Sequence, residues 1–521
     1  MRKPARRQRP RLRALVAASL VFALLFPSAP ASAQTAQTTI DTAVGLQSYT
    51  DPATQSPIHI TATGSVSSSS GRPAINDPIY LGAGTWSVLN EGTIHGSGTD
   101  AGGNSSNGIT WQTNAGDRVD IDNSGTIRTD GGYAVFQRSG GYLGLNNSGT
   151  IRTDGHMGVV AWSISGATID NSGEIYATAG AGSTAIGITL TSPTDDVSIT
   201  NSGKIEAYHN ANMSANAISI GNVAAGSSVR ITNTKDGLIS ATRGNTSQTT
   251  TGISVSSGKF TLDNAGTIES SHGNGVILSG VYGATVTNSG TITGAATDGT
   301  TAGRGVSVTT AGGATGPVSI TNSGSITTGA GAGDALAVDT SASASAVETT
   351  IANAALGAIS AGGAGAAVKG TQADAGLLTL TNDGIVSASG GGGGVSVSGG
   401  AATVVNRGAA SSTGAAAVSV ANAAGASISN TGVLSGAAGV EATGSSSSSA
   451  LSLANSGPGV ISGGASPGVS GGAGTWAVSN SGTISSGGGA GVAMSGAASG
   501  SVSNAASGSI TGATGVDLSA S

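Results

Sequence analysis

Few side chains in this sequence have types and spacings that suit catalysis or metal binding. The five histidines are scattered along the chain, without an HExxH motif or a close His/Asp cluster, at His59, His95, His156, His209 and His272. A metal site needs several ligands that converge on one point. We therefore expect no metal, no cofactor and no histidine-based catalytic centre.

The best group of carboxylates is Asp117, Asp120 and Asp122. Asp120 and Asp122 are two residues apart, so they share one face of an extended strand, and Arg118 lies beside them. An enzyme that cleaves polysaccharide uses two carboxylates that converge on one bond. The simpler interpretation is a solvated strand edge, so we expect no catalytic residue and keep a polysaccharide-acting enzyme as the alternative function.

A repeated tetrad, NSGT and its variants, is the most regular polar feature of the chain. The spacings between successive leading asparagines are 33, 24, 24, 30, 32, 31, 24, 34, 31, 29, 24, 24, 25, 25 and 24 residues. A minimum of 24 that is never undercut indicates one structural unit with insertions. The leading asparagines are Asn90, Asn123, Asn147, Asn171, Asn201, Asn233, Asn264, Asn288, Asn322, Asn353, Asn382, Asn406, Asn430, Asn455, Asn480 and Asn504.

Each unit reads as three short strands joined by bends. The segment from Gly283, GATVTNSGTITG, alternates apolar and polar residues up to the asparagine, bends at Asn-Ser-Gly, and continues with Thr-Ile. A third segment follows a glycine-rich gap, as in residues 158–162. Alternation with period two marks strands with one buried face, and we expect asparagine and glycine at the bends because both tolerate positive φ.

Stacked copies of such a unit predict an all-β fold, a right-handed parallel β-helix with at least about 24 residues per three-strand coil. About 16 coils at ~4.8 Å each form a rod with inward columns of valine and isoleucine. The asparagines then lie one above another, and we predict that their amides form a hydrogen-bonded ladder. A strip that binds a ligand or sugar stays open as the other role of these asparagines.

Composition and charge narrow the possible functions. The chain has 89 glycines, no cysteine and few aromatic residues, which by itself also suits a disordered chain, but the fixed repeat favours the solenoid. Seven of its 20 basic residues and none of its 26 acidic residues lie in residues 1–33. The rest of the chain therefore carries 13 basic against 26 acidic residues, a net charge of −13, which argues against nucleic acid as a partner.

The sequence divides into a leader, a capping region and the repeats. Residues 1–33 resemble a secretory signal peptide, with a basic start, an apolar run over 14–26 and the small residues Ala31-Ser32-Ala33. Residues 34–80 lack the tetrad and are expected to cap the solenoid. The repeats fill 81–521, with insertions over 81–381 and regular spacing over 382–521.

The insertions are expected to lie on exposed edges of the rod, where solenoids carry variable loops. Contact candidates are Gly96 to Asn107 and the insertions between Asn201 and Asn233 and between Asn288 and Asn322. The regular part, 382–521, is expected to be the more stable half because short connections cost less closure entropy, although its dense glycine acts in the opposite direction.

Signal peptide, NSGTI-type repeats and absence of cysteine together make the chain resemble the passenger of an autotransporter, the type V secretion system of Gram-negative bacteria. Pertactin-like and related adhesin passengers are right-handed β-helices. The resemblance implies export through the periplasm to the cell surface or beyond, adhesion to a protein or glycan receptor, and an outer-membrane translocator barrel. That barrel is missing from this sequence. The NPNL and NPNG motifs of two-partner haemagglutinins are absent too.

Overall fold

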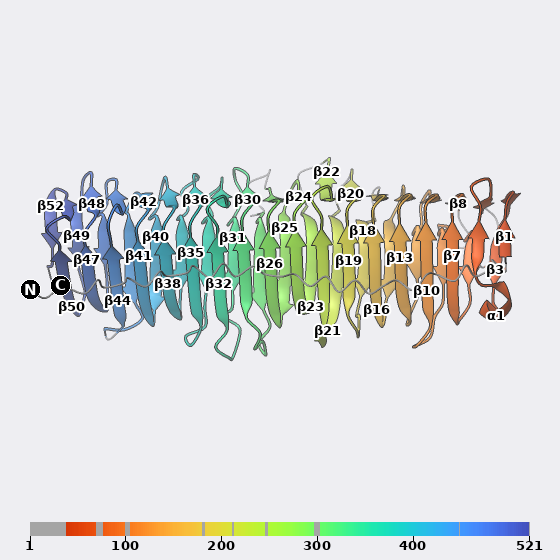
Figure 1. Cartoon of the computed structure of the whole chain (residues 1–521), viewed down its shortest axis with the longest axis horizontal. Coiled ribbons are helices and arrows are strands. Elements are labelled where there is room, and N and C mark those ends of the chain that lie inside the picture. The colour runs from red at the N-terminus through yellow and green to blue at the C-terminus, as the bar shows by residue number, and fades with distance from the viewer. Residues whose placement is uncertain are drawn as a thin grey trace, which may run out of the picture. The chain divides into compact units, whose positions relative to one another are not determined.

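The computed structural model describes residues 38–68, 77–98, 105–179, 183–210, 213–244, 248–295, 303–447 and 449–519. Residues Ala36–Ser521 form one compact unit. The predicted signal peptide, 1–33, lies outside the described residues. The described part is a stack of parallel strands with a single four-residue helix, α1 (Pro52–Gln55), which confirms the predicted β-solenoid (Figure 1).

Every coil contributes one strand to each of three faces. The first face holds β1 (Thr38–Ile40), β4 (Ile58–Ile60), β7 (Thr85–Asn90), β10 (Arg118–Asn123), β13 (Tyr142–Asn147), β16 (Gly166–Asn171), β19 (Val197–Asn201), β26 (Gly283–Asn288), β29 (Val318–Asn322), β32 (Glu348–Asn353), β35 (Leu377–Asn382), β38 (Ala401–Asn406), β41 (Gly425–Asn430), β44 (Ala450–Asn455), β47 (Thr475–Asn480) and β50 (Ser499–Asn504).

The second face follows the asparagine bend. It holds β2 (Ala43–Val44), β5 (Ser65–Ser67), β8 (Thr93–Gly96), β11 (Thr126–Thr129), β14 (Thr150–Thr153), β17 (Glu174–Ala179), β20 (Lys204–His209), β22 (Leu238–Arg243), β24 (Thr267–Ser270), β27 (Thr291–Gly294), β30 (Ser325–Thr328), β33 (Ala358–Ala361), β36 (Ile385–Ala388), β39 (Ala409–Ser412), β42 (Val433–Gly436), β45 (Val460–Gly463), β48 (Thr483–Ser486) and β51 (Ser509–Thr511).

The third face leads back to the next coil. It holds β3 (Gln47–Tyr49), β6 (Ile79–Leu81), β9 (Ile109–Trp111), β12 (Val135–Gln137), β15 (Met157–Trp162), β18 (Ala185–Thr191), β25 (Asn274–Val281), β28 (Val306–Thr310), β31 (Leu336–Asp339), β34 (Val368–Thr371), β37 (Val395–Ser398), β40 (Val418–Ala423), β43 (Val440–Gly444), β46 (Val469–Gly471), β49 (Ala490–Met494) and β52 (Thr514–Asp517). The long strands β21 (Ala215–Asn233) and β23 (Thr250–Asn264) run from the third face into the first.

Inward side chains of the three faces form one core along the stack. On the second face, Ile127, Ile151 and Ile175 occupy the same height in successive coils and are fully buried. Burial of each such side chain stabilises the fold by about 1.5–3 kcal/mol. Because every coil repeats these positions, small residues between them still yield a continuous core.

The described part of the predicted capping region is built from two further coils. β1–β2–β3 and β4–β5–β6 stack on the repeats in parallel register, with Thr38 beside Ile58 and Ile58 beside Val88. In these coils Ile40 and Ile60 occupy the position of the asparagine, with Ile60 in register with Asn90. The solenoid therefore begins before the sequence motif does.

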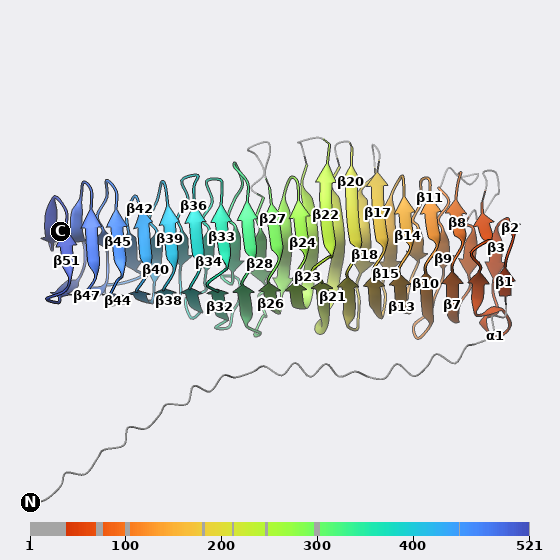
Figure 2. The same cartoon turned by 45° about the horizontal axis from the view of Figure 1, so that its top comes forward.

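The insertions after Asn171, Asn201 and Asn233 build a ridge along one edge of the rod. β17, β20 and β22 are longer than the neighbouring second-face strands. Their last residues, Ala179, His209 and Arg243, lie beside one another. Figure 2 shows these three strands rising above the neighbouring second-face strands. A separate apolar cluster packs inside the ridge and consists of Ala179, Ala185, Ala207 and Ala215.

Candidate functional site

The tetrad asparagines form an unbroken column at the bend between the first and second faces. The side-chain Nδ2 of each asparagine from Asn90 to Asn480 donates a hydrogen bond to Oδ1 of the asparagine in the next coil, at 2.6–2.9 Å. Nδ2 also contacts backbone carbonyl oxygens of its own and the next coil, as for Asn123 with Gly125 and Thr150 at 3.3 Å.

The asparagine column is inside the protein. From Asn90 to Asn480 these side chains are at most 2 % exposed. The amide groups consequently meet each other and the backbone, and a ligand in solvent has no access to them. A buried amide left without partners costs about 1–3 kcal/mol, so the ladder holds successive coils in one register.

Glycine occupies the bend position because there is no space for a side chain there. We expected positive φ at these bends, but neither the tetrad asparagines nor Gly125 and Gly149 adopt it. A Cβ on Gly149 would collide with the carbonyl oxygen of Gly125 in the preceding coil, and the same contact recurs up the stack. The amides of Ser148 and Gly149 both donate to the carbonyl of Asn123, at 2.8 and 3.0 Å, which draws the coils this close.

The ladder has a defined beginning at Asn90. Oδ1 of Asn90 is buried and has no hydrogen-bond partner among the described residues. Its neighbour in the preceding coil is Ile60, which is fully buried and offers no donor. At the other end, Asn504 is exposed and its Nδ2 donates to the carbonyl of Gly508 at 2.9 Å.

Outside the bend, the second face carries a row of charged side chains. His95 lies 3.0 Å from Asp130, Arg128 contacts Asp130 and Asp154 at 3.1 and 3.5 Å, and Arg152 contacts Asp154 at 2.8 Å. Burial alone would raise the pKa of Asp130, but hydrogen bonds and charges from His95 and Arg128 lower it. The Arg152 guanidinium lies 4.8 Å from the ring centre of Tyr176 in the next coil.

The carboxylates singled out in the sequence lie on the first face. Asp120 accepts a hydrogen bond from Arg118 at 2.7 Å and lies against Gly144 of the next coil, where a side chain would displace it. This hydrogen bond raises the pKa of Arg118, whose guanidinium also stacks on Tyr142 at 4.5 Å. Asp120 and Asp122 line a shallow depression of about 170 Å³. Asp117 instead binds the backbone amide of Asn114 at 2.7 Å.

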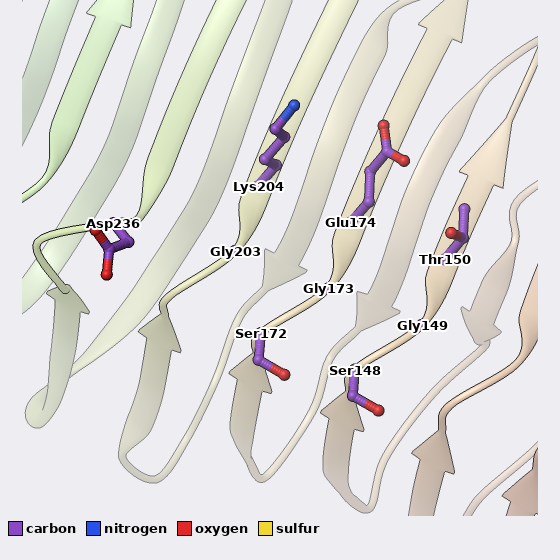
Figure 3. A pocket seen from close by; sticks show the side chains of 9 residues that line it. All are labelled: Ser148, Gly149, Thr150, Ser172, Gly173, Glu174, Gly203, Lys204 and Asp236. Carbon is purple, nitrogen blue, oxygen red and sulfur yellow. The ribbon is translucent and has the colours of Figure 1, made fainter.

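A second depression, of about 430 Å³, follows the outside of the asparagine bend (Figure 3). Its lining comes from equivalent positions of neighbouring coils, with Ser148 and Ser172 at the bend and Thr150, Glu174 and Lys204 at the starts of β14, β17 and β20. It is a shallow surface groove with mixed charge and no convergent donor set.

The five histidines do not converge. His59 pairs with Glu91 at 3.1 Å, and His95 belongs to the charged row. His209 is buried in the ridge and its ring contacts the carbonyl of Ser183 at 2.7 Å. The ring of His272 contacts Ser271 at 2.7 Å. Among the described residues no group of three histidine, cysteine or acidic side chains is placed to hold a metal ion.

An aromatic band on the third face was missed by the sequence analysis. Ring centres of Tyr133 and Phe136 are 4.7 Å apart, those of Tyr133 and His156 4.7 Å, and those of Phe136 and Trp162 4.8 Å. Burial lowers the pKa of His156 and raises that of Tyr133. These residues come from two coils, and the outermost two are 29 positions apart, so only the stacking register brings them together.

The described residues contain no helix with the length and apolar character of a membrane span. No family model, no curated protein and no solved structure matches this chain.

Proposed function

We propose that the chain is an exported passenger that acts at the cell surface as an adhesin or interaction scaffold. The main observation in favour of this proposal is the uneven distribution of outward side chains along one continuous rod. Nearly all described ion pairs, every cation–π contact and the aromatic band lie between Ile40 and Asn353, on coils that also hold the largest insertions. A solenoid uses such variable outer positions for binding, since its inner positions are fixed by stacking.

The proposal is tested by binding to candidate target cells. The purified chain should bind saturably, and a variant with the charged row neutralised by Arg128→Gln and Arg152→Gln should bind more weakly at low salt. A matched variant, Ser411→Ala with Ser435→Ala at the same second-face position in the regular half, should bind like the unaltered chain. Equal binding by all three would contradict a contact surface in the looped half.

Export is a separate part of the proposal. The leader-like pattern over residues 1–33 supports secretion, and the net charge of −13 on the remainder suits a soluble rod outside the cell. Expression in a Gram-negative host together with an outer-membrane translocator should yield surface chain whose N-terminus lies near Gln34. A chain that retains Met1 and stays inside the cell would count against export.

A polysaccharide-acting enzyme is the competing function, because Asp120 and Asp122 line one depression. Asp120 already accepts a hydrogen bond from Arg118, and a glycosidase also needs a proton donor. Assay against a panel of polysaccharides should show no turnover. Turnover that is lost in Asp120→Ala would replace the scaffold proposal with the enzyme.

A further inference from the structure

We propose that the aromatic band of Tyr133, Phe136, His156 and Trp162, together with Arg138, binds a pyranose sugar that carries a carboxylate. The inference rests on the proposed surface function and names the ligand class of one site on the rod.

Trp162 differs from every other described tryptophan. Trp86, Trp111 and Trp476 are 0–2 % exposed and belong to the core, whereas Trp162 is 39 % exposed. It lies at the end of β15 and points away from the core, between the inward Ala161 and the turn residue Ser163. Since the fold does not need an indole at this surface position, its large apolar face is available to a ligand.

The band is held rigidly before any ligand arrives. The rings of Phe136 and Tyr133 meet Trp162 edge to face, with interplanar angles of 79° and 75°. Val160 points outward on the same face, in register with Phe136, yet it is fully buried. The ring planes are inclined to one another, so the apolar surface offered to the C–H face of a pyranose ring is the exposed indole of Trp162. Its contacts with the two neighbouring rings order this indole in advance, which lowers the entropic cost of binding.

Arg138 supplies the charge beside this surface. It is exposed, and its guanidinium lies 5.8 Å from the ring centre of Phe136. Arg118, Arg128 and Arg152 each pair with an aspartate, but Arg138 forms no ion pair with a carboxylate of the described residues. A guanidinium binds a carboxylate with two parallel hydrogen bonds, so this arginine favours an acidic sugar over a neutral one.

The neighbouring coil adds a polar side chain beside Arg138. The backbone amide of Arg138 donates to the carbonyl of Trp111 at 3.1 Å, which places Arg138 beside Gln112. Gln112 is exposed and accepts from the Tyr80 hydroxyl at 3.3 Å. Its side-chain amide N–H groups remain as donors for sugar hydroxyls. The combination of apolar platform, carboxylate-binding cation and amide is the chemistry of a uronate or sialic-acid site.

The test uses the full chain and three acidic probes: a hyaluronan oligosaccharide, a galacturonate oligosaccharide and sialyllactose. Binding of at least one probe should change tryptophan fluorescence, because Trp162 is the exposed indole. Trp162→Ala should weaken binding about tenfold or more. Arg138→Gln should remove the preference for the probe over its carboxyl-reduced derivative.

Matched control variants distinguish binding at a specific site from nonspecific binding to the surface of the protein. Met213→Ala removes an apolar side chain of similar exposure, 38 %, from the ridge. Lys369→Gln removes an exposed third-face cation from β34. Both should bind like the unaltered chain. The inference is overturned if none of the probes binds, if Trp162→Ala binds equally well, or if the reduced probe binds as tightly. Continued adhesion to cells in those cases would leave the surface function intact.

Discussion

The coils up to Asn353 and those from Asn382 onward share one fold but present different surfaces. At one outward position of the second face, the first region begins with His95, Arg128, Arg152 and Tyr176 and changes through Glu206, Ser240 and Glu269 to Thr293 and Thr327. The second region carries hydroxyls at this position, at Ser387, Ser411, Ser435, Ser462 and Ser485. The inward residue just before this position is apolar in both regions, as at Ile127 and Ile151 in the first and Leu434 and Ile461 in the second. Stacking constrains the inner positions only, so the outer positions are free to acquire function.

The regular region also has a smaller core. Its inward positions include Ala402, Ala410 and Ala442, where the same columns of the looped region more often hold a larger apolar residue, such as Leu143, Ile127 and Leu278. At the first position of the second-face strands it exposes Ile385 and Val433, where β17 and β20 carry Glu174 and Lys204. The asparagine ladder is common to the two regions. It stabilises the stack in both, although the size of the inward apolar side chains differs between them.

The largest expected effect concerns the two coils that lack the asparagine. Ile58→Asn should destabilise the N-terminal coils by about 3–5 kcal/mol, because it buries an amide beside Val88 with no partner. Ile60→Asn should cost at least about 2 kcal/mol less, since the introduced amide meets the unpaired Oδ1 of Asn90. Amide hydrogen exchange of β4 and β7 measures both. Equal costs would show that the ladder cannot be extended.

A smaller effect tests whether the ladder acts alike in both regions. Asn147→Ala and Asn430→Ala should each destabilise their surroundings by about 1–3 kcal/mol, because each removes two ladder hydrogen bonds and leaves the buried Oδ1 of the next asparagine without its ladder donor. Guanidinium unfolding followed by hydrogen exchange compares them. A difference of more than about 2 kcal/mol would mean that local packing, and not the ladder, dominates one region.

Limited proteolysis distinguishes regularity from glycine content as the source of stability. We expect the first cuts between Asn201 and Asn322, where connections are longest, and a resistant core within residues 382–521. A difference of about 1 kcal/mol in local opening changes the cleavage rate roughly fivefold. Earlier loss of the C-terminal coils would show that glycine and the smaller core outweigh regular spacing.

The smallest effect is the pH response of the aromatic band. Burial lowers the pKa of His156, so the unfolded chain, with a pKa near 6.5, binds a proton more readily than the folded one. The contribution of His156 to local stability should be full above pH ~6.5 and should fall below that pH until the folded pKa is passed. Acrylamide quenching of Trp162 at pH 7.5 and 5 measures it. His156→Phe should abolish the change, and an unchanged response would assign it elsewhere.

The sequence by itself determined the solenoid and its ladder. A minimum spacing of 24 residues, alternation before each asparagine and Thr-Ile after it are local patterns, and they suffice because each coil packs only on its neighbours. The same reasoning failed for residues 38–81, where the motif is absent although the alternation persists at Ile58 and Ile60.

Only the tertiary structure decided which outward residues meet. Tyr133 and Trp162 belong to different repeats, and their edge-to-face contact depends on the register between coils. The ridge likewise required the insertions of three successive coils to extend paired strands together. The bend glycine depends on a carbonyl one coil away, so its cause was invisible in the local pattern. The sequence period determines the inside of the stack because the inward positions recur in every coil. The surface is determined by contacts between residues of different coils, and these contacts do not recur.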